Sequence, residues 1–112
     1  MNRFAFSLAD IKRTSQELGL AAIRSPLLPL GGSASYEIRL KAENLQPTGS
    51  FKIRGSTAAI NALNPQDLQN GVYTASAGNF GQGVAQAARK AGVGARVYVP
   101  ENAARIKISA LK

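Results

Sequence analysis

The sequence ENLQPTGSFKIRG at residues 43–55 places a lysine, Lys52, beside the expected start of a helix. Ser50 is a residue type that caps helix N-termini, and it predicts a helix from about Phe51 to Leu63. The positive end of the helix dipole disfavours an ammonium group there, and partial burial disfavours it further. Both effects favour the neutral amine, which is the form that attacks a carbonyl carbon. The alternative interpretation is an ordinary lysine with its amine in solvent.

A second stretch, SAGNFGQG at residues 76–83, lies between a strand predicted at 71–75 and a helix predicted from about Gln82 to Ala91. Small residues in such a turn let backbone amides point toward an anion, and the helix N-terminus adds partial positive charge. Asn79 contributes a side chain that both donates and accepts hydrogen bonds. The alternative is a tight turn that needs glycine for its backbone conformation alone. The glycine spacing matches neither the dinucleotide-binding fingerprint nor the P-loop.

The segments around these two stretches predict an α/β fold. Alternating apolar and polar side chains predict a strand at residues 35–42, and another strand is expected at 96–99. Residues 25–32 are rich in proline and glycine and predict an extended, turn-rich connector. The order of strand, turn, helix and strand favours a parallel unit, within a three-layer arrangement of helices on a parallel or mixed sheet.

Two further helices are expected near the ends of the chain. One covers residues 7–20, with Ser7 as its cap and Gly19 as its end, and the other covers residues 103–112. The second helix reaches Lys112 without a stop signal. We therefore expect the natural protein to continue, and this chain to be its N-terminal piece.

Composition excludes several kinds of chemistry. The 112 residues include no cysteine and no histidine, so disulfides, thiolate catalysis, Ser-His-Asp chemistry and Cys/His metal sites are not available within them. The net charge of +8 raises the possibility of nucleic-acid binding, but the basic residues are spread along the chain. No apolar run is long enough to span a membrane and no secretion signal is visible. We expect a cytoplasmic protein that binds neither nucleic acid nor membrane, and no metal site.

The two stretches together resemble the fold-type II pyridoxal-phosphate enzymes, the tryptophan-synthase-β-like superfamily. Within it they are most similar to the branch of threonine/serine dehydratases and serine racemases. That branch carries E-N-x-Q-x-T-G-S-F-K-x-R-G-A and then S-[AS]-G-N-H-[AG]-Q-G, which residues 43–55 and 76–83 follow in order. Further similarity lies in Ser25-Pro26-Leu27 and in residues 97–101 with Lys107, so the resemblance extends from Ser25 to Lys112.

The resemblance implies pyridoxal 5'-phosphate as the cofactor, with Lys52 bonded to it covalently. It implies that Phe51 packs beside the pyridine ring and that Asn79 donates a hydrogen bond to the ring's 3'-oxygen. The substrate carboxylate is expected at the backbone amides of Ser76, Ala77, Gly78 and Asn79. The implied reaction is that of a threonine or serine ammonia-lyase, which releases a 2-oxo acid and ammonia.

The resemblance also implies a two-domain α/β enzyme with the cofactor between its domains, assembled as a homo-oligomer. Residues 1–65 are expected in the large domain, and residues 71–112 are expected to begin the small one. The family's glycine-rich phosphate-binding loop follows later in its members and has no counterpart after Asn79 here. We therefore expect these 112 residues alone to bind the cofactor weakly and to be inactive.

Three positions depart from the family pattern or distinguish among the activities found in the family. Phe80 stands where the family has histidine, and Ala77 stands where racemases carry a serine that acts as an acid/base on the second face of the substrate. Alanine cannot transfer a proton, which favours a dehydratase over a racemase. Pro47 stands where a nucleotide-binding racemase has lysine, which argues against that regulation. Threonine synthase, β-substitution and racemase activities remain alternatives, as does a non-catalytic truncated remnant.

Overall fold

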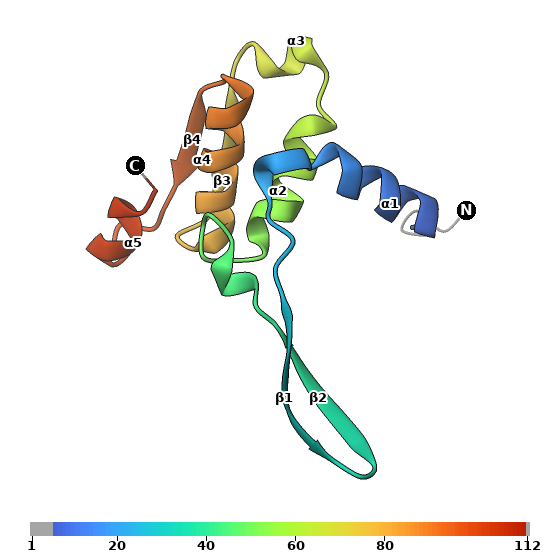
Figure 1. Cartoon of the computed structure of the whole chain (residues 1–112). Coiled ribbons are helices and arrows are strands. Elements are labelled where there is room, and N and C mark those ends of the chain that lie inside the picture. Colours follow the sequence, from blue (N-terminus) through green and yellow to red (C-terminus); the bar gives the residue numbers. More distant parts are fainter. Residues whose placement is uncertain (1–5, 112) are drawn as a thin grey trace.

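The computed structural model describes residues 6–111 and has helices and strands in alternation, so the α/β class is confirmed. Figure 1 shows a body of helices and a parallel strand pair, from which a β-hairpin projects. Within the described part of the chain, the strands form two separate pairs. None of the helices in that part has the length and hydropathy needed to cross a lipid bilayer.

Helix α1, Leu8–Glu17, begins as the sequence predicts. The Ser7 hydroxyl accepts a hydrogen bond from the backbone amide of Asp10 at 3.1 Å, and the Asp10 carboxylate accepts one from the Ser7 amide at 3.0 Å. This reciprocal capping box satisfies amides that a helix leaves free at its N-terminus. The helix ends earlier than predicted, and a 3-10 turn, η1 (Gly19–Ala21), follows it.

The hairpin corrects one prediction. Strands β1, Leu27–Ser33, and β2, Tyr36–Lys41, pair in antiparallel fashion, so the segment predicted as a connector is largely a strand. Its proline and glycines indicated turns, but the strand accommodates them with a register shift between Pro29 and Gly31. Every residue of both strands is exposed.

The loop of the first stretch leads into the central helix. It contains a 3-10 turn, η2 (Glu43–Leu45), and is followed by α2, Lys52–Asn61, and a short helix, α3 (Pro65–Leu68). Helix α2 buries residues at a helical spacing, so one face is covered along its whole length. These residues are Ile53, Ser56, Thr57 and Ile60.

The second stretch joins the parallel strands. Strand β3, Val72–Ala75, pairs in parallel with β4, Ala95–Tyr98, and α4, Asn79–Ala91, connects them and packs on both. Gly92 ends α4 with φ of +72°, a backbone conformation that glycine adopts without strain. A last helix, α5 (Arg105–Ser109), follows; Lys112, at the end of the helix predicted there, lies outside the described residues.

The prediction that α4 begins near Gln82 was wrong, because it begins at Asn79. Gly81 and Gly83, which indicated a turn, are buried inside the helix. A side-chain carbon at Gly81 would lie 2.7 Å from the carbonyl oxygen of Ser76, so close packing requires glycine there.

The apolar core forms where α2, α4 and β3 meet. Its buried members are Ile60, Val84, Ala87 and Ala88, with Leu68, Val72 and Val93 packed against them. The core therefore combines residues from both predicted domain segments, 1–65 and 71–112, whose separation stays a prediction. It also holds α2 against α4, the two helices that carry the sequence-predicted site residues.

Candidate active site

Lys52 is the first residue of α2 and is partly buried. The structure assigns the N-cap to Phe51 rather than Ser50, and the Ser50 hydroxyl instead accepts a hydrogen bond from the Lys52 backbone amide at 3.3 Å. The Lys52 Nζ lies 4.8 Å from the centroid of the Phe51 ring. Among residues 6–111, no carboxylate or carbonyl oxygen holds this amine by an ion pair or hydrogen bond. The amine is therefore free to react.

Three backbone amides at the beginning of α4 have no partner in the described part of the chain. One is that of Ala77 in the preceding turn, and the others are those of Asn79 and Phe80 in the first turn of the helix. The Ser76 amide donates to the carbonyl oxygen of Tyr98 at 3.0 Å. The Ser76 hydroxyl accepts hydrogen bonds from the amides of Gly78 at 3.3 Å and Gly81 at 3.1 Å.

Of the four amides predicted to hold a carboxylate, Ala77 and Asn79 are thus free, whereas Ser76 and Gly78 are engaged. The sequence analysis overlooked Phe80 as a third free donor. Its position in the first turn of a helix is the signal that would have found it, because the first amides of a helix have no partner within it.

Close packing of α2 on α4 brings the two stretches together. A side-chain carbon built at Gly83 would lie 3.2 Å from the backbone oxygen of Lys52. Gly83 lies about one helical turn after Asn79, and a turn rises about 5.4 Å. Lys52 and Asn79 therefore sit at the beginnings of two helices in direct contact. Phe51 and Phe80, beside them in sequence, are both exposed.

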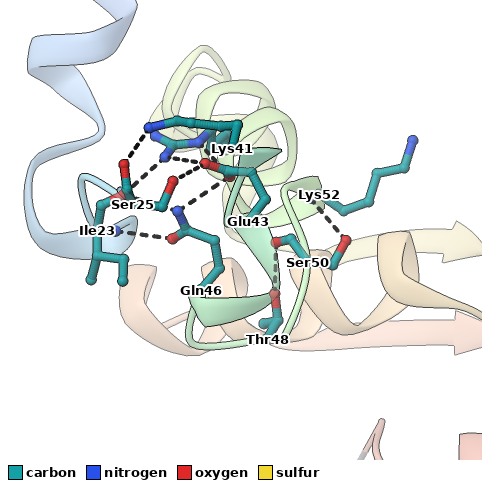
Figure 2. Close-up of polar contacts among 9 residues, drawn as sticks. Ile23, Ser25, Lys41, Glu43, Gln46, Thr48, Ser50 and Lys52 are labelled. Carbon is teal, nitrogen blue, oxygen red and sulfur yellow. Dashed lines mark hydrogen bonds and ion pairs between the residues drawn. The ribbon is translucent and has the colours of Figure 1, made fainter. Parts of the chain in front are cut away.

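A polar cluster holds the beginning of α2 on the side away from the Lys52 amine (Figure 2). At its centre the carboxylate of Glu43 accepts two hydrogen bonds of 2.9 Å from the guanidinium of Arg54. Gln46 donates to the same carboxylate at 3.2 Å, and so does the Ser25 hydroxyl. In Figure 2 the Lys52 side chain extends away from the side chains of Glu43 and Gln46.

The cluster also pins the segment that leads to the hairpin. The side-chain amide of Gln46 both accepts from the backbone amide of Ile23 and donates to its carbonyl oxygen, each at 2.9 Å. Arg54 donates to the same carbonyl oxygen at 2.9 Å. Hydrogen bonds therefore join the segment before the hairpin, the loop at Glu43 and helix α2. The residue of α2 that makes them, Arg54, is two positions after Lys52.

The hydrogen bonds from Arg54, more than its charge, lower the pKa of Glu43 to about 2, against the opposing effect of partial burial. The hydrogen bonds to Glu43 in turn raise the pKa of Arg54. Both groups stay charged at neutral pH. The sequence analysis missed this cluster, because the burial of Gln46 that calls for such partners is visible only in the folded chain.

Comparisons with known proteins identify the family of this chain. The sequence model of a family described as "Pyridoxal-phosphate dependent enzyme" matches residues 18–112. The chain is 38% identical over 108 residues to a serine racemase of Dictyostelium discoideum, covering 94% of this chain and 33% of that protein. It is 39% identical over 110 residues to the catabolic L-threonine dehydratase TdcB of Staphylococcus aureus, covering 95% of this chain and 32% of that protein.

The fold is also that of a solved relative. The structure of maize serine racemase matches with a TM-score of 0.86 at 30% identity, over 96% of this chain and 34% of that one. The chain thus spans about a third of the length of the proteins that it matches. The similar proteins include both racemases and dehydratases.

Proposed function

The chain belongs to the family of pyridoxal-phosphate-dependent enzymes, and on that premise we propose that its polypeptide removes the β-hydroxyl group of L-threonine or L-serine. The products are a 2-oxo acid and ammonia. Similarity to the fold-type II dehydratases and racemases supports an amino-acid substrate. The observation that favours elimination is Ala77, whose methyl group cannot move a proton at the position where racemases have serine.

The described residues fit the aldehyde and the ring of the cofactor. Lys52 offers an amine that pairs with no carboxylate among residues 6–111, and Phe51 offers an exposed aromatic face beside it. Asn79 has an exposed side chain that no protein group holds in the described part of the chain. We propose that these three residues hold the aldehyde, the ring and its 3'-oxygen, respectively.

The cofactor, when bound, supplies an electron sink that stabilises negative charge at the substrate's α-carbon. We propose that Lys52 Nζ would hold the cofactor by its aldehyde carbon, and that the same amine, when free, would accept the proton from the substrate's α-carbon. The free amides of Ala77 and Asn79, with Phe80, donate hydrogen bonds to the substrate carboxylate. This carboxylate contact orients the α-carbon–hydrogen bond toward Lys52, and Phe51 keeps water from one side.

The test is a product assay on the polypeptide that carries these residues, supplied with pyridoxal phosphate. We expect 2-oxobutanoate from L-threonine or pyruvate from L-serine, each with an equal amount of ammonia. D-Serine is measured in the samples supplied with L-serine. The proposal fails if these samples give D-serine faster than pyruvate and L-threonine gives no 2-oxobutanoate, which supports a racemase, or if no product forms, which supports the non-catalytic alternative.

Replacing Ala77 by serine tests the argument from that position. A hydroxyl at residue 77 provides a group that moves a proton on the second face of the substrate, so we expect the ratio of D-serine to pyruvate to rise about tenfold. The ratio is measured by chiral chromatography after incubation with L-serine. Ala77→Gly is the control, because it changes the backbone freedom without adding a proton donor. An equal rise in both variants would contradict the interpretation.

A further inference from the structure

Helices α2 and α4 approach each other unusually closely where they cross. A side-chain carbon built at Gly83 would lie 2.5 Å from the Ser56 hydroxyl oxygen, 3.2 Å from the Ser56 Cβ and 3.2 Å from the Lys52 carbonyl oxygen. Non-bonded carbon and oxygen atoms do not approach to 2.5 Å without repulsion. The Ser56 Cβ and the Lys52 carbonyl oxygen cannot rotate away from Gly83, so a side chain there would push the helices apart. The backbones of α2 and α4 come into contact here because Ser56 and Gly83 are both small.

The Ser56 side chain is enclosed at this contact. It is fully buried, and its hydroxyl oxygen has no hydrogen-bond partner in the described part of the chain. A buried hydroxyl without a partner destabilises a fold, since it loses its hydrogen bonds to water. Packing at this crossing is therefore tight enough to exclude both a side chain at Gly83 and a partner for Ser56.

The contact lies next to the site on both helices. Ser56 follows Lys52 by four residues on α2, and Gly83 follows Asn79 by four residues on α4. Each contact residue is thus about one turn from a residue of the proposed site. The apolar core, which includes Ile60, lies further along the helices. Separation at the crossing would therefore move Lys52 relative to Asn79 while the core still holds the far ends together.

We infer that Gly83, in contact with Ser56, is a positioning residue that sets the spacing between Lys52 and the turn containing Asn79. The inference rests on the proposed function, because it concerns the same amine and the same turn. A displacement of about 1 Å in a reacting group can lower a rate by about 100-fold. All three separations, 2.5 Å to the Ser56 hydroxyl and 3.2 Å to the Ser56 Cβ and the Lys52 carbonyl oxygen, are shorter than the 3.4 Å at which ordinary contacts begin, so we expect an added methyl group to displace Lys52 from the turn.

The experiment mixes the cofactor-free polypeptide that carries these residues with pyridoxal phosphate and follows, by absorbance, formation of the carbon–nitrogen bond to Lys52. Gly83→Ala is expected to lower the first-order rate of bond formation by about 100-fold, with little change in the cofactor concentration at half-saturation. Ser56→Gly removes both side-chain atoms that the added methyl group meets. The double variant Gly83→Ala/Ser56→Gly is therefore expected to recover to within tenfold of Ser56→Gly alone.

Gly55→Ala is the matched control. It makes the same substitution on α2 at an exposed position where an added carbon meets nothing within 4 Å, so we expect its rate to stay within twofold of the natural chain. Thermal unfolding of every variant is recorded, and rates are compared well below each midpoint.

The outcomes separate this inference from the proposed function. A folded Gly83→Ala polypeptide that reacts at the natural rate overturns the positioning role and leaves the function intact. If Gly83→Ala does not fold, the double variant still carries the test, and a folded double variant that remains 100-fold slow overturns the inference. A natural polypeptide that forms no bond at Lys52 overturns both proposals.

Discussion

Replacing Lys52 by alanine is expected to abolish the covalent bond to pyridoxal phosphate and to lower the rate of 2-oxo acid release by at least about 1,000-fold. The reason is that no other described amine lies beside an exposed aromatic ring at the beginning of a helix. This helix, α2, packs against α4, whose first turn contains free amides. Borohydride reduction of the loaded polypeptide, followed by peptide mapping, gives the position of the bond directly. We expect the label on the peptide containing Lys52 and its loss in Lys52→Ala.

Lys12→Ala is the control for this prediction. Lys12 is exposed on α1, so the variant removes one amine and one positive charge without touching the candidate site. Its labelling and its rate should match those of the natural chain. A label on another lysine, or an active Lys52→Ala variant, would contradict the assignment of the reactive amine.

Local sequence rules predicted the parts of this fold that depend on local interactions. The cap at Ser7 and the end of α4 at Ala91 were predicted because each depends on residues within one turn. Strand β1 and the start of α4 were not predicted, because glycine and proline were interpreted as turn residues there. In the structure, residue 83 of α4 is glycine for a different reason. Helix α2 passes so close that no side chain fits there. That reason involves a partner 27 positions earlier, Ser56, and is invisible to a local pattern.

The same distinction applies to the candidate site. Lys52 was singled out from its chemistry and its place at an expected helix start, and Asn79 from its side chain in a glycine-rich turn. The structure brings the helices that begin with these two residues into contact. The sequence could not predict which backbone amides stay free, because this depends on which of them donate to the Ser76 hydroxyl. The partners of Glu43 were missed for a similar reason. They come from the segment before the hairpin and from α2, and only the folded chain brings them together.

Replacing Glu43 by glutamine is expected to lower the free energy of unfolding by about 2 kcal/mol at neutral pH. The carboxylate accepts hydrogen bonds from Arg54, Gln46 and Ser25, and a glutamine side chain can accept with only one of its two end atoms. The Arg54 and Glu43 side chains are 34% and 18% exposed, so solvent weakens their attraction below that of a fully buried pair. Urea unfolding at pH 7 of the polypeptide that carries these residues measures the loss.

The effect has a defined dependence on pH. The pKa of Glu43 is lowered from an ordinary 4.5 to about 2 in the folded chain, so the folded state binds a proton less readily than the unfolded state. The stabilisation is therefore complete above about pH 4.5 and is lost as the pH falls toward about 2. The stability difference between the natural chain and Glu43→Gln should shrink over the same interval, because the uncharged glutamine does not titrate.

The exposed pair of Glu37 and Arg39 on β2 provides the matched control. Their ion pair has the same 2.9 Å separation, from Arg39 Nε to Glu37 Oε1, but the side chains are 55% and 57% exposed. Surface pairs contribute little, so Glu37→Gln should change the free energy of unfolding by less than about 0.5 kcal/mol. Equal losses in the two variants would mean that charge alone, rather than the three-segment cluster at Glu43, accounts for the stabilisation. A loss at Glu43 alone, fading below pH 4.5, would mean that this cluster anchors the helix that begins with Lys52.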